Sequence, residues 1–284
     1  MKGGTSDSTF PVREAFIQAG LLRTYVREAG SGDPVVLIHG LGGPHAWERV
    51  LPELAASRRV LVPDLPGFGK SDCPRGGFTV DQFGDYIADL LGALSIQRCV
   101  LVGISFGGEI AVACAARHPG RVAGLVLISS TGMGPRRRIA TLPLFRDIFR
   151  FLLKRWILRS RWATDILSRR AYYDPGSRPP EIVGLFHNEL SDVSKRDSWL
   201  DAFWNVLIPP EEFGRWLSNL RVPVLLLWGE HDRAVPLMIA REFQSRIREC
   251  RLIEVSDCAH ALPLEKPEVT CAEIRNFVAA LHTP

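Results

Sequence analysis

The chain has 284 residues, of which 46% are hydrophobic and 23% are charged, with a formal net charge of +4. These are ordinary values for a globular protein, and the length allows one large α/β domain with an inserted subdomain. Because no apolar run reaches 18 residues and no nucleic-acid-binding motif accompanies the charge, we expect neither a membrane-spanning helix nor nucleic-acid binding.

Short apolar runs alternate with longer amphipathic segments along most of the chain, as in an α/β protein. The short runs predict buried strands at residues 35–39, 59–63, 98–104, 122–129, 222–228 and 250–255. The longer segments predict helices at 46–57, 79–95, 106–118, 237–247 and 267–281. Because the strands are apolar without alternation, we expect them to be buried on both faces and mostly parallel, joined by right-handed crossovers.

The alternation stops between Gly132 and Pro210. This stretch has a helical pattern and is rich in Trp and Phe, so we predict a helical cap at 132–210 inserted into a core of residues 1–131 and 211–284. It contains an apolar stripe at helical spacing, which either packs on the core or contacts substrate. The stripe consists of Leu142, Leu144, Phe145, Ile148, Phe149 and Leu152.

A basic run lies inside the predicted cap. Between Arg136 and Arg170 there are eleven Lys or Arg against two Asp, a local net charge of +9. We expect a solvated helix face, and the alternative is peripheral contact with an anionic membrane or with an acidic substrate.

The six cysteines form no C-x-x-C pair and none lies beside a histidine at metal-ligand spacing. Cys99 and Cys114 lie inside apolar runs, where a free thiol behaves as a small hydrophobic group. The first ten residues lack the apolar core of a signal peptide. We therefore predict a cytoplasmic chain with reduced thiols and no structural disulfide.

Ser105 lies in the sequence Gly103-Ile104-Ser105-Phe106-Gly107, which matches G-x-S-x-G between a predicted strand and a predicted helix. A serine on such a sharp turn needs small neighbours, and the turn projects its hydroxyl off the sheet edge. The helix N-terminus favours developing negative charge there. We predict that Ser105 is a nucleophile.

A serine nucleophile needs a base and an orienting carboxylate. His260 follows the last predicted strand, at the sheet edge where α/β proteins place their sites. Asp232 follows the preceding strand, giving the order Ser, Asp, His along the chain. We predict His260 as the base and Asp232 as its partner, with Glu230 and Asp257 as alternative carboxylates.

The glycine-rich segment after the first predicted strand, residues 39–43 (HGLGG), predicts an oxyanion hole. Glycines let backbone N–H groups approach a tetrahedral oxyanion. We predict the N–H groups of Leu41 and Phe106 as donors, with Gly42 as the alternative to Leu41.

From about Phe16 to Leu281 the chain resembles the α/β-hydrolase superfamily, in its capped serine-hydrolase branch of carboxylesterases and monoacylglycerol-lipase-like proteins. Besides the segments above, residues 64–71 (DLPGFGKS) are similar to the family's D-x-x-G-x-G-x-S turn, and 228–236 (WGEHDRAVP) to its acid loop. The resemblance implies an α/β-hydrolase fold, an acyl-enzyme mechanism without metal or organic cofactor, and a small ester substrate with an apolar acyl group.

Related branches remain as alternatives. Ser105 excludes the haloalkane dehalogenases and epoxide hydrolases, which carry an Asp nucleophile. Cofactor-free haloperoxidase-like members share the triad. Meta-cleavage-product C–C hydrolases share the layout but usually carry an aromatic residue directly after the catalytic histidine, where this chain has Ala261. We predict an ester hydrolase, and the alternatives are a C–C hydrolase, an amidase or a non-catalytic ligand receptor.

The predicted pocket walls are His39, Gly40, Phe145, Phe149 and Ala261.

Overall fold

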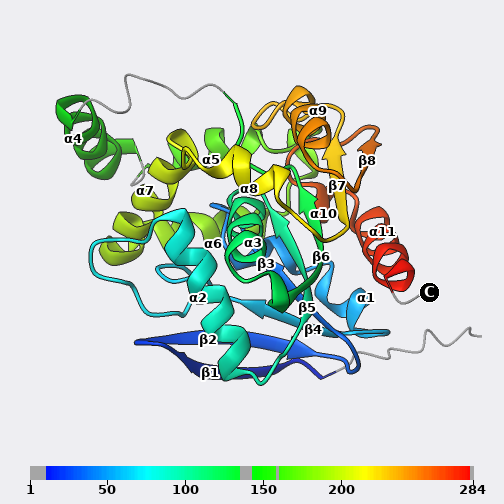
Figure 1. Ribbon diagram of the computed structural model, residues 1–284. Coiled ribbons are helices and arrows are strands. Elements are labelled where there is room, and N and C mark those ends of the chain that lie inside the picture. The colour runs from blue at the N-terminus through cyan, green and yellow to red at the C-terminus, as the bar shows by residue number, and fades with distance from the viewer. Residues whose placement is uncertain (1–10, 135–142, 158–159, 282–284) are drawn as a thin grey trace, which may run out of the picture.

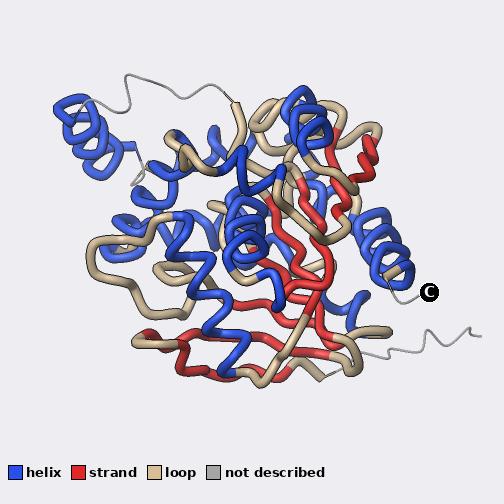
Figure 2. Tube along the Cα trace, viewed as in Figure 1, coloured by secondary structure: helices blue, strands red, loops and turns tan. Residues whose placement is uncertain are grey.

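A computed structural model describes residues 11–134, 143–157 and 160–281. Within these ranges eight strands form one sheet in the order β1-β2-β4-β3-β5-β6-β7-β8, and helices lie on both sides of it (Figures 1 and 2). The strands are β1 Arg13–Ala19, β2 Leu22–Ala29, β3 Pro34–Ile38, β4 Arg59–Pro63, β5 Cys99–Ile104, β6 Val122–Ile128, β7 Val224–Gly229 and β8 Cys250–Val255. All pairs from β4 to β8 are parallel, so the predicted, mostly parallel sheet is confirmed.

The helices of the core divide between the two faces of the sheet. Side chains of α2 Val80–Ala93, α3 Phe106–Arg117, α8 Phe213–Ser218 and α9 Leu237–Arg246 belong to one buried cluster, and those of α1 Leu51–Ala55, α10 Leu262–Glu265 and α11 Pro267–Ala280 to another. Single turns of 3-10 helix occur at η1 Pro44–Trp47 and η2 Pro119–Arg121.

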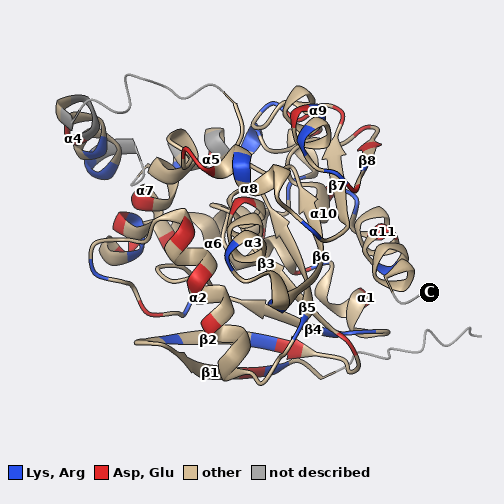
Figure 3. Ribbon diagram, in the orientation of Figure 1, with Lys and Arg blue, Asp and Glu red and all other residues tan. Residues whose placement is uncertain are grey.

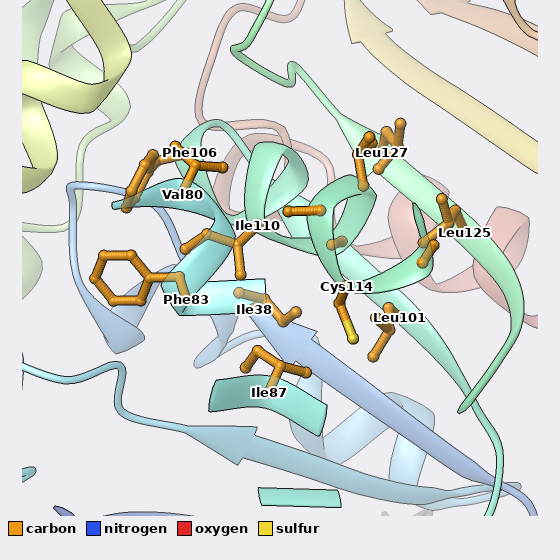
Figure 4. Close-up of a cluster of buried hydrophobic side chains, with 14 of the residues drawn as sticks. Ile38, Val80, Phe83, Ile87, Leu101, Phe106, Ile110, Cys114, Leu125 and Leu127 are labelled. Carbon is orange, nitrogen blue, oxygen red and sulfur yellow. The ribbon is translucent and has the colours of Figure 1, made fainter. Parts of the chain in front are cut away.

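Successive residues of the central strands point to opposite faces of the sheet and belong to different buried clusters. On β3, Val36 and Ile38 belong to the α2–α3 side, while Val35 and Leu37 belong to the α1–α11 side. Figure 4 shows Ile38 among the side chains of α2 and α3. Because both faces are buried, these strands read as continuous apolar runs, and this is why the sequence located them within one or two residues.

Two parts of the core differ from the sequence analysis. The antiparallel hairpin of β1 and β2 was not predicted, because β1 is an edge strand whose residues are mostly exposed. The predicted helix at 46–57 is wrong: the chain forms η1 and then only the short α1. Pro52 lacks an N–H and stands in the first turn of α1, a position that a continuous helix through 46–57 cannot accommodate.

Between β6 and β7 the described residues form a series of helices, called the insertion below; the cap boundaries at 132–210 stay a prediction. Its elements are α4 Pro143–Leu152, the π-turn η4 Leu153–Ile157, α5 Arg161–Arg169, the 3-10 turn η5 Pro175–Ser177, α6 Pro180–Ser191 and α7 Val193–Leu207. Helix α4 lies at the outer edge of the molecule, away from the sheet (Figure 1).

The basic run is partly compensated by acidic residues of α7. Arg150 pairs with Asp201, and Lys154 pairs with Asp197 at 2.7 Å. Figure 3 colours the Lys and Arg positions blue and the Asp and Glu positions red along the ribbon. Arg136, Arg137, Arg138, Arg159 and Leu142 lie outside the described residues. Membrane contact through this run stays a prediction. No helix within the described ranges is long and apolar enough to cross a bilayer.

The contact between β3 and α3 leads to a stability prediction. A Cβ atom on Gly107 would lie 2.2 Å from the Ile38 carbonyl oxygen, so Gly107→Ala must push α3 off the strand. We expect a loss of about 1–3 kcal/mol in the free energy of unfolding, measured by urea denaturation. The control Gly184→Ala in α6 adds a Cβ with no neighbour within 4 Å and should gain up to about 1 kcal/mol. Equal stabilities of the two variants would contradict this account.

Candidate active site

Ser105 lies on a strained turn between β5 and α3. Its backbone has φ 54° and ψ −122°, a conformation that costs a non-glycine residue on the order of 1–3 kcal/mol. Three hydrogen bonds hold the turn: from the Ser105 N–H to the Ile128 carbonyl (2.9 Å), and to the Ser105 carbonyl from the N–H groups of Gly108 (3.0 Å) and Thr131 (3.2 Å). A Cβ on Gly103 would lie 2.3 Å from the Gly107 carbonyl oxygen, so the turn needs glycine there.

Asp232 and His260 come together from the loops after β7 and β8. The Nδ1 atom of His260 lies 2.8 Å from Oδ2 of Asp232. The other carboxylate oxygen of Asp232 accepts the backbone N–H groups of Ala234 and Val235, both at 2.8 Å. The alternative carboxylates, Glu230 and Asp257, are both exposed. The structure therefore brings His260 together with Asp232 and leaves Glu230 and Asp257 at the surface.

The pKa values of this pair shift in opposite directions. Burial acts to raise the pKa of Asp232, but the His260 charge and the hydrogen bonds to the carboxylate outweigh it and hold this pKa below its usual value. Burial acts to lower the pKa of His260, but the Asp232 charge and hydrogen bond outweigh it and raise this pKa. An imidazolium is thus stabilised at the position where a base would take up a proton.

Ser105 and His260 line a common cavity of about 410 Å³. Its walls come from loops of the core and from helices of the insertion. The core contributes Gly40, Leu41, Gly42, Ala46, Ile104, Thr131, Ala234, Val235, Ala261, Pro263 and Leu264; the insertion contributes Ser168, Ala171, Tyr172, Ile182, Val183, Phe186, Trp199, Phe203, Val206 and Leu207. Among these described lining residues there is no Lys, Arg, Asp or Glu.

The predicted oxyanion residues lie beside Ser105. Leu41 and Gly42 both line the cavity. A Cβ on Gly40 would lie 2.9 Å from the Cβ of Ser105 and 3.5 Å from the Phe106 nitrogen, so the glycine-rich turn meets the start of α3 without any intervening side chain. The Phe106 ring is buried against Phe83, with 5.4 Å between ring centroids, and only its backbone N–H could serve a substrate.

Of the predicted pocket walls, Gly40 and Ala261 line the cavity. The structure places Phe149 elsewhere, with its ring 6.2 Å from that of Trp204. The side chain of Phe145 lies outside the described residues.

His39 is fully buried behind the cavity rather than in its wall. Its Nδ1 donates to the Gly40 carbonyl (2.8 Å), and its Nε2 accepts the Leu65 N–H (3.0 Å). Burial lowers the pKa of His39 to about 3. The ring is therefore neutral near neutral pH, and it ties the turn after β3 to the loop after β4.

The sequence analysis predicted none of the ten described wall residues that the insertion supplies. On α7, Trp199, Phe203, Val206 and Leu207 line the cavity at helical spacing, a periodicity that could have identified this face. No comparable pattern marks Tyr172, which precedes η5. On the core side, Thr131 also lines the cavity and donates to the buried Glu109 at 2.8 Å; burial raises the pKa of that carboxyl to about 8.

Comparison with known proteins places this arrangement in a family. Residues 33–267 match the family described as alpha/beta hydrolase fold. The chain belongs to the α/β-hydrolase family. It is 32% identical to 2-hydroxymuconate semialdehyde hydrolase of Pseudomonas sp. strain CF600, over 93% of this chain and 92% of the relative.

Two further relatives are similar over almost the whole chain. 2-Hydroxy-6-oxo-2,4-heptadienoate hydrolase of Pseudomonas putida is 29% identical, over 93% of this chain and 95% of the relative. The crystal structure of a serine hydrolase involved in carbazole degradation superposes with a TM-score of 0.80 and 25% identity, over 95% of this chain and all of the other. These relatives support a hydrolase, and the expected carboxylesterase branch is not confirmed.

The His260–Asp232 contact leads to a prediction on proton affinity. Replacing Asp232 by Asn removes the charge that raises the pKa of His260 and leaves the burial that lowers it. We expect Asp232→Asn to lower the pKa of His260, measured by NMR titration of the imidazole. Asp257→Asn, which changes an exposed carboxylate, should leave the value unchanged. A fall of equal size in both variants would contradict the assignment.

Proposed function

We propose that the chain is a serine hydrolase that works through Ser105, His260 and Asp232. The observation that carries this proposal is the His260–Asp232 hydrogen bond at a cavity which Ser105 also lines. The strained backbone of Ser105 at the start of α3 supports it, because this geometry exposes a hydroxyl beside a helix N-terminus.

In the proposed reaction, Ser105 attacks a substrate carbonyl carbon while His260 takes the hydroxyl proton. Asp232 holds the imidazole in the required tautomer and stabilises the imidazolium. The N–H groups of Phe106 and of the turn at Leu41 and Gly42 receive the oxyanion. The bond to the leaving group breaks, His260 returns the proton to that group, and water then releases the acyl group as an acid.

For the scissile bond we propose a carbon–carbon bond beside a ketone, in a conjugated 2-hydroxy-6-oxo-dienoate. The relatives that cover nearly the whole chain support this choice, since one is a hydrolase of 2-hydroxy-6-oxo-2,4-heptadienoate. The dienol would first ketonise, its hydroxyl proton moving to the carbon beside the ketone, so that the fragment gains a conjugated 2-oxo group. When the bond breaks, its electron pair would delocalise into this 2-oxo group as a dienolate, which accepts the proton from His260. The ketone carbon would leave as a carboxylic acid.

Ester hydrolysis is the second candidate, and two observations favour it. The described lining of the cavity carries no cation that would pair with a dienoate carboxylate. Ala261 also leaves the position after His260 without the aromatic residue usual in C–C hydrolases. An ester with an apolar acyl group needs neither feature.

A side-by-side assay distinguishes the two substrates. We expect kcat/KM for 2-hydroxy-6-oxo-2,4-heptadienoate, followed by loss of the dienol absorbance, to exceed that for 4-nitrophenyl butyrate by at least about 10-fold, a difference of about 1.4 kcal/mol in transition-state stabilisation. The reverse ranking would reject the C–C proposal in favour of the ester.

The nucleophile is tested separately from the substrate. A fluorophosphonate probe should label the protein at Ser105, identified by peptide mass spectrometry. Ser105→Ala should abolish labelling and lower kcat by at least about 10³-fold. The control Ser245→Ala alters an exposed serine of α9 and should leave both unchanged. Labelling of folded protein at another residue would reject the proposed mechanism.

A further inference from the structure

A hydrogen bond joins the insertion to the glycine-rich turn beside Ser105. The Gly43 N–H donates to the Gly40 carbonyl at 3.1 Å, which closes a four-residue turn with Leu41 and Gly42 at its centre. The indole N–H of Trp199 donates to the Leu41 carbonyl at 2.9 Å, although Trp199 lies 158 positions further along the chain. The central peptide of this turn is therefore held from outside the core.

The central peptide of such a turn has two available orientations. Type I and type II turns differ by a rotation of about 180° of this peptide, and type II requires a positive φ at the third residue. Gly42 is absent from the glycines with positive φ, so the turn is type I. A glycine tolerates the other state as well, and a Cβ on Gly42 would meet nothing within 4 Å. The orientation of the Leu41–Gly42 peptide is therefore not set by steric contacts at Gly42.

The orientation matters because the central peptide carries the Leu41 carbonyl and the Gly42 N–H. Both residues line the cavity beside Ser105. A rotated peptide would exchange the directions of its N–H and its carbonyl, and a carbonyl dipole facing an oxyanion is repulsive where an N–H is attractive. For the Gly42 N–H to serve as an oxyanion donor, this peptide must therefore stay in one state.

The Trp199 side chain is held rigidly enough to keep the Leu41–Gly42 peptide in one orientation. Its side chain is 7% exposed, and its ring stacks on Phe203 with 5.2 Å between centroids and 9° between planes. The indole is therefore fixed in place before substrate binds, and little side-chain entropy remains to be lost.

We propose that Trp199 is a positioning residue of the oxyanion turn: its indole N–H locks the Leu41–Gly42 peptide in the orientation that serves the transition state. The inference rests on the proposed serine-hydrolase function. It assigns to the insertion a part in the chemical step besides forming cavity walls.

The test compares Trp199→Phe with Trp204→Phe. Both residues lie on α7 and are buried, but the indole nitrogen of Trp204 has no hydrogen-bond partner, so the control removes a similar ring without breaking a bond. We expect Trp199→Phe to lower kcat about 3- to 10-fold, the effect of losing one neutral hydrogen bond, with KM changed less than about 2-fold. Trp204→Phe should keep both constants within about 2-fold.

A rescue variant separates positioning from general packing. Alanine disfavours the positive φ of a type II turn, so Gly42→Ala should hold the central peptide in the type I state without the indole. The double variant Trp199→Phe/Gly42→Ala should therefore have a higher kcat than Trp199→Phe alone. A packing defect at Trp199 would not respond to Gly42.

The outcomes distinguish the inference from the function on which it rests. If Ser105-dependent hydrolysis is present but Trp199→Phe behaves like Trp204→Phe, or changes KM alone, only the inference is overturned. The inference also fails if the double variant is no faster than Trp199→Phe. Absence of hydrolysis of either substrate by the wild-type protein overturns both the function and the inference.

Discussion

The close approach of three backbone segments around Ser105 is the constraint on which the site depends. The ends of β3 and β5 and the start of α3 meet where Gly103 and Gly107 leave no room for side chains. This contact requires the positive φ of Ser105, and hydrogen bonds to Ile128, Gly108 and Thr131 offset its strain. The same packing that builds the sheet therefore places the hydroxyl at its edge. Folding and the exposure of the nucleophile have one physical cause.

Around this point the core and the insertion contribute different things. The core supplies Ser105, His260 and Asp232, which the loops after three parallel strands bring to one edge of the sheet. The insertion supplies much of the apolar wall of the cavity. Several hydrogen bonds cross between them, and two of these are the bond from the Trp199 indole N–H to the Leu41 carbonyl and the bond from the Ala261 N–H to the Ala171 carbonyl at 2.8 Å. Both lie next to residues of the proposed chemistry.

The sequence predicted those features that depend on residues close together in the chain. Ser105 and His260 follow strands that read as apolar runs, so their placement at one sheet edge required only the parallel order of the strands. His39 and Phe149 were assigned to the cavity wrongly, because the direction a side chain faces depends on partners distant in sequence: Leu65 for His39 and Trp204 for Phe149. The exposed edge strand β1 escaped notice for a related reason, since it lacks the continuous apolar run of a buried strand.

The position of the insertion has a consequence for how such proteins diversify. The chain leaves the sheet after β6 and returns at β7, and these two strands are direct neighbours. The two junctions of the insertion therefore lie at adjacent strands, and a segment of any length that ends near its start can occupy this place without altering strand order or register. The sheet can therefore stay the same while the segment between β6 and β7 is exchanged. Recombination at this point could supply a new set of cavity walls in one event while keeping the reactive residues intact.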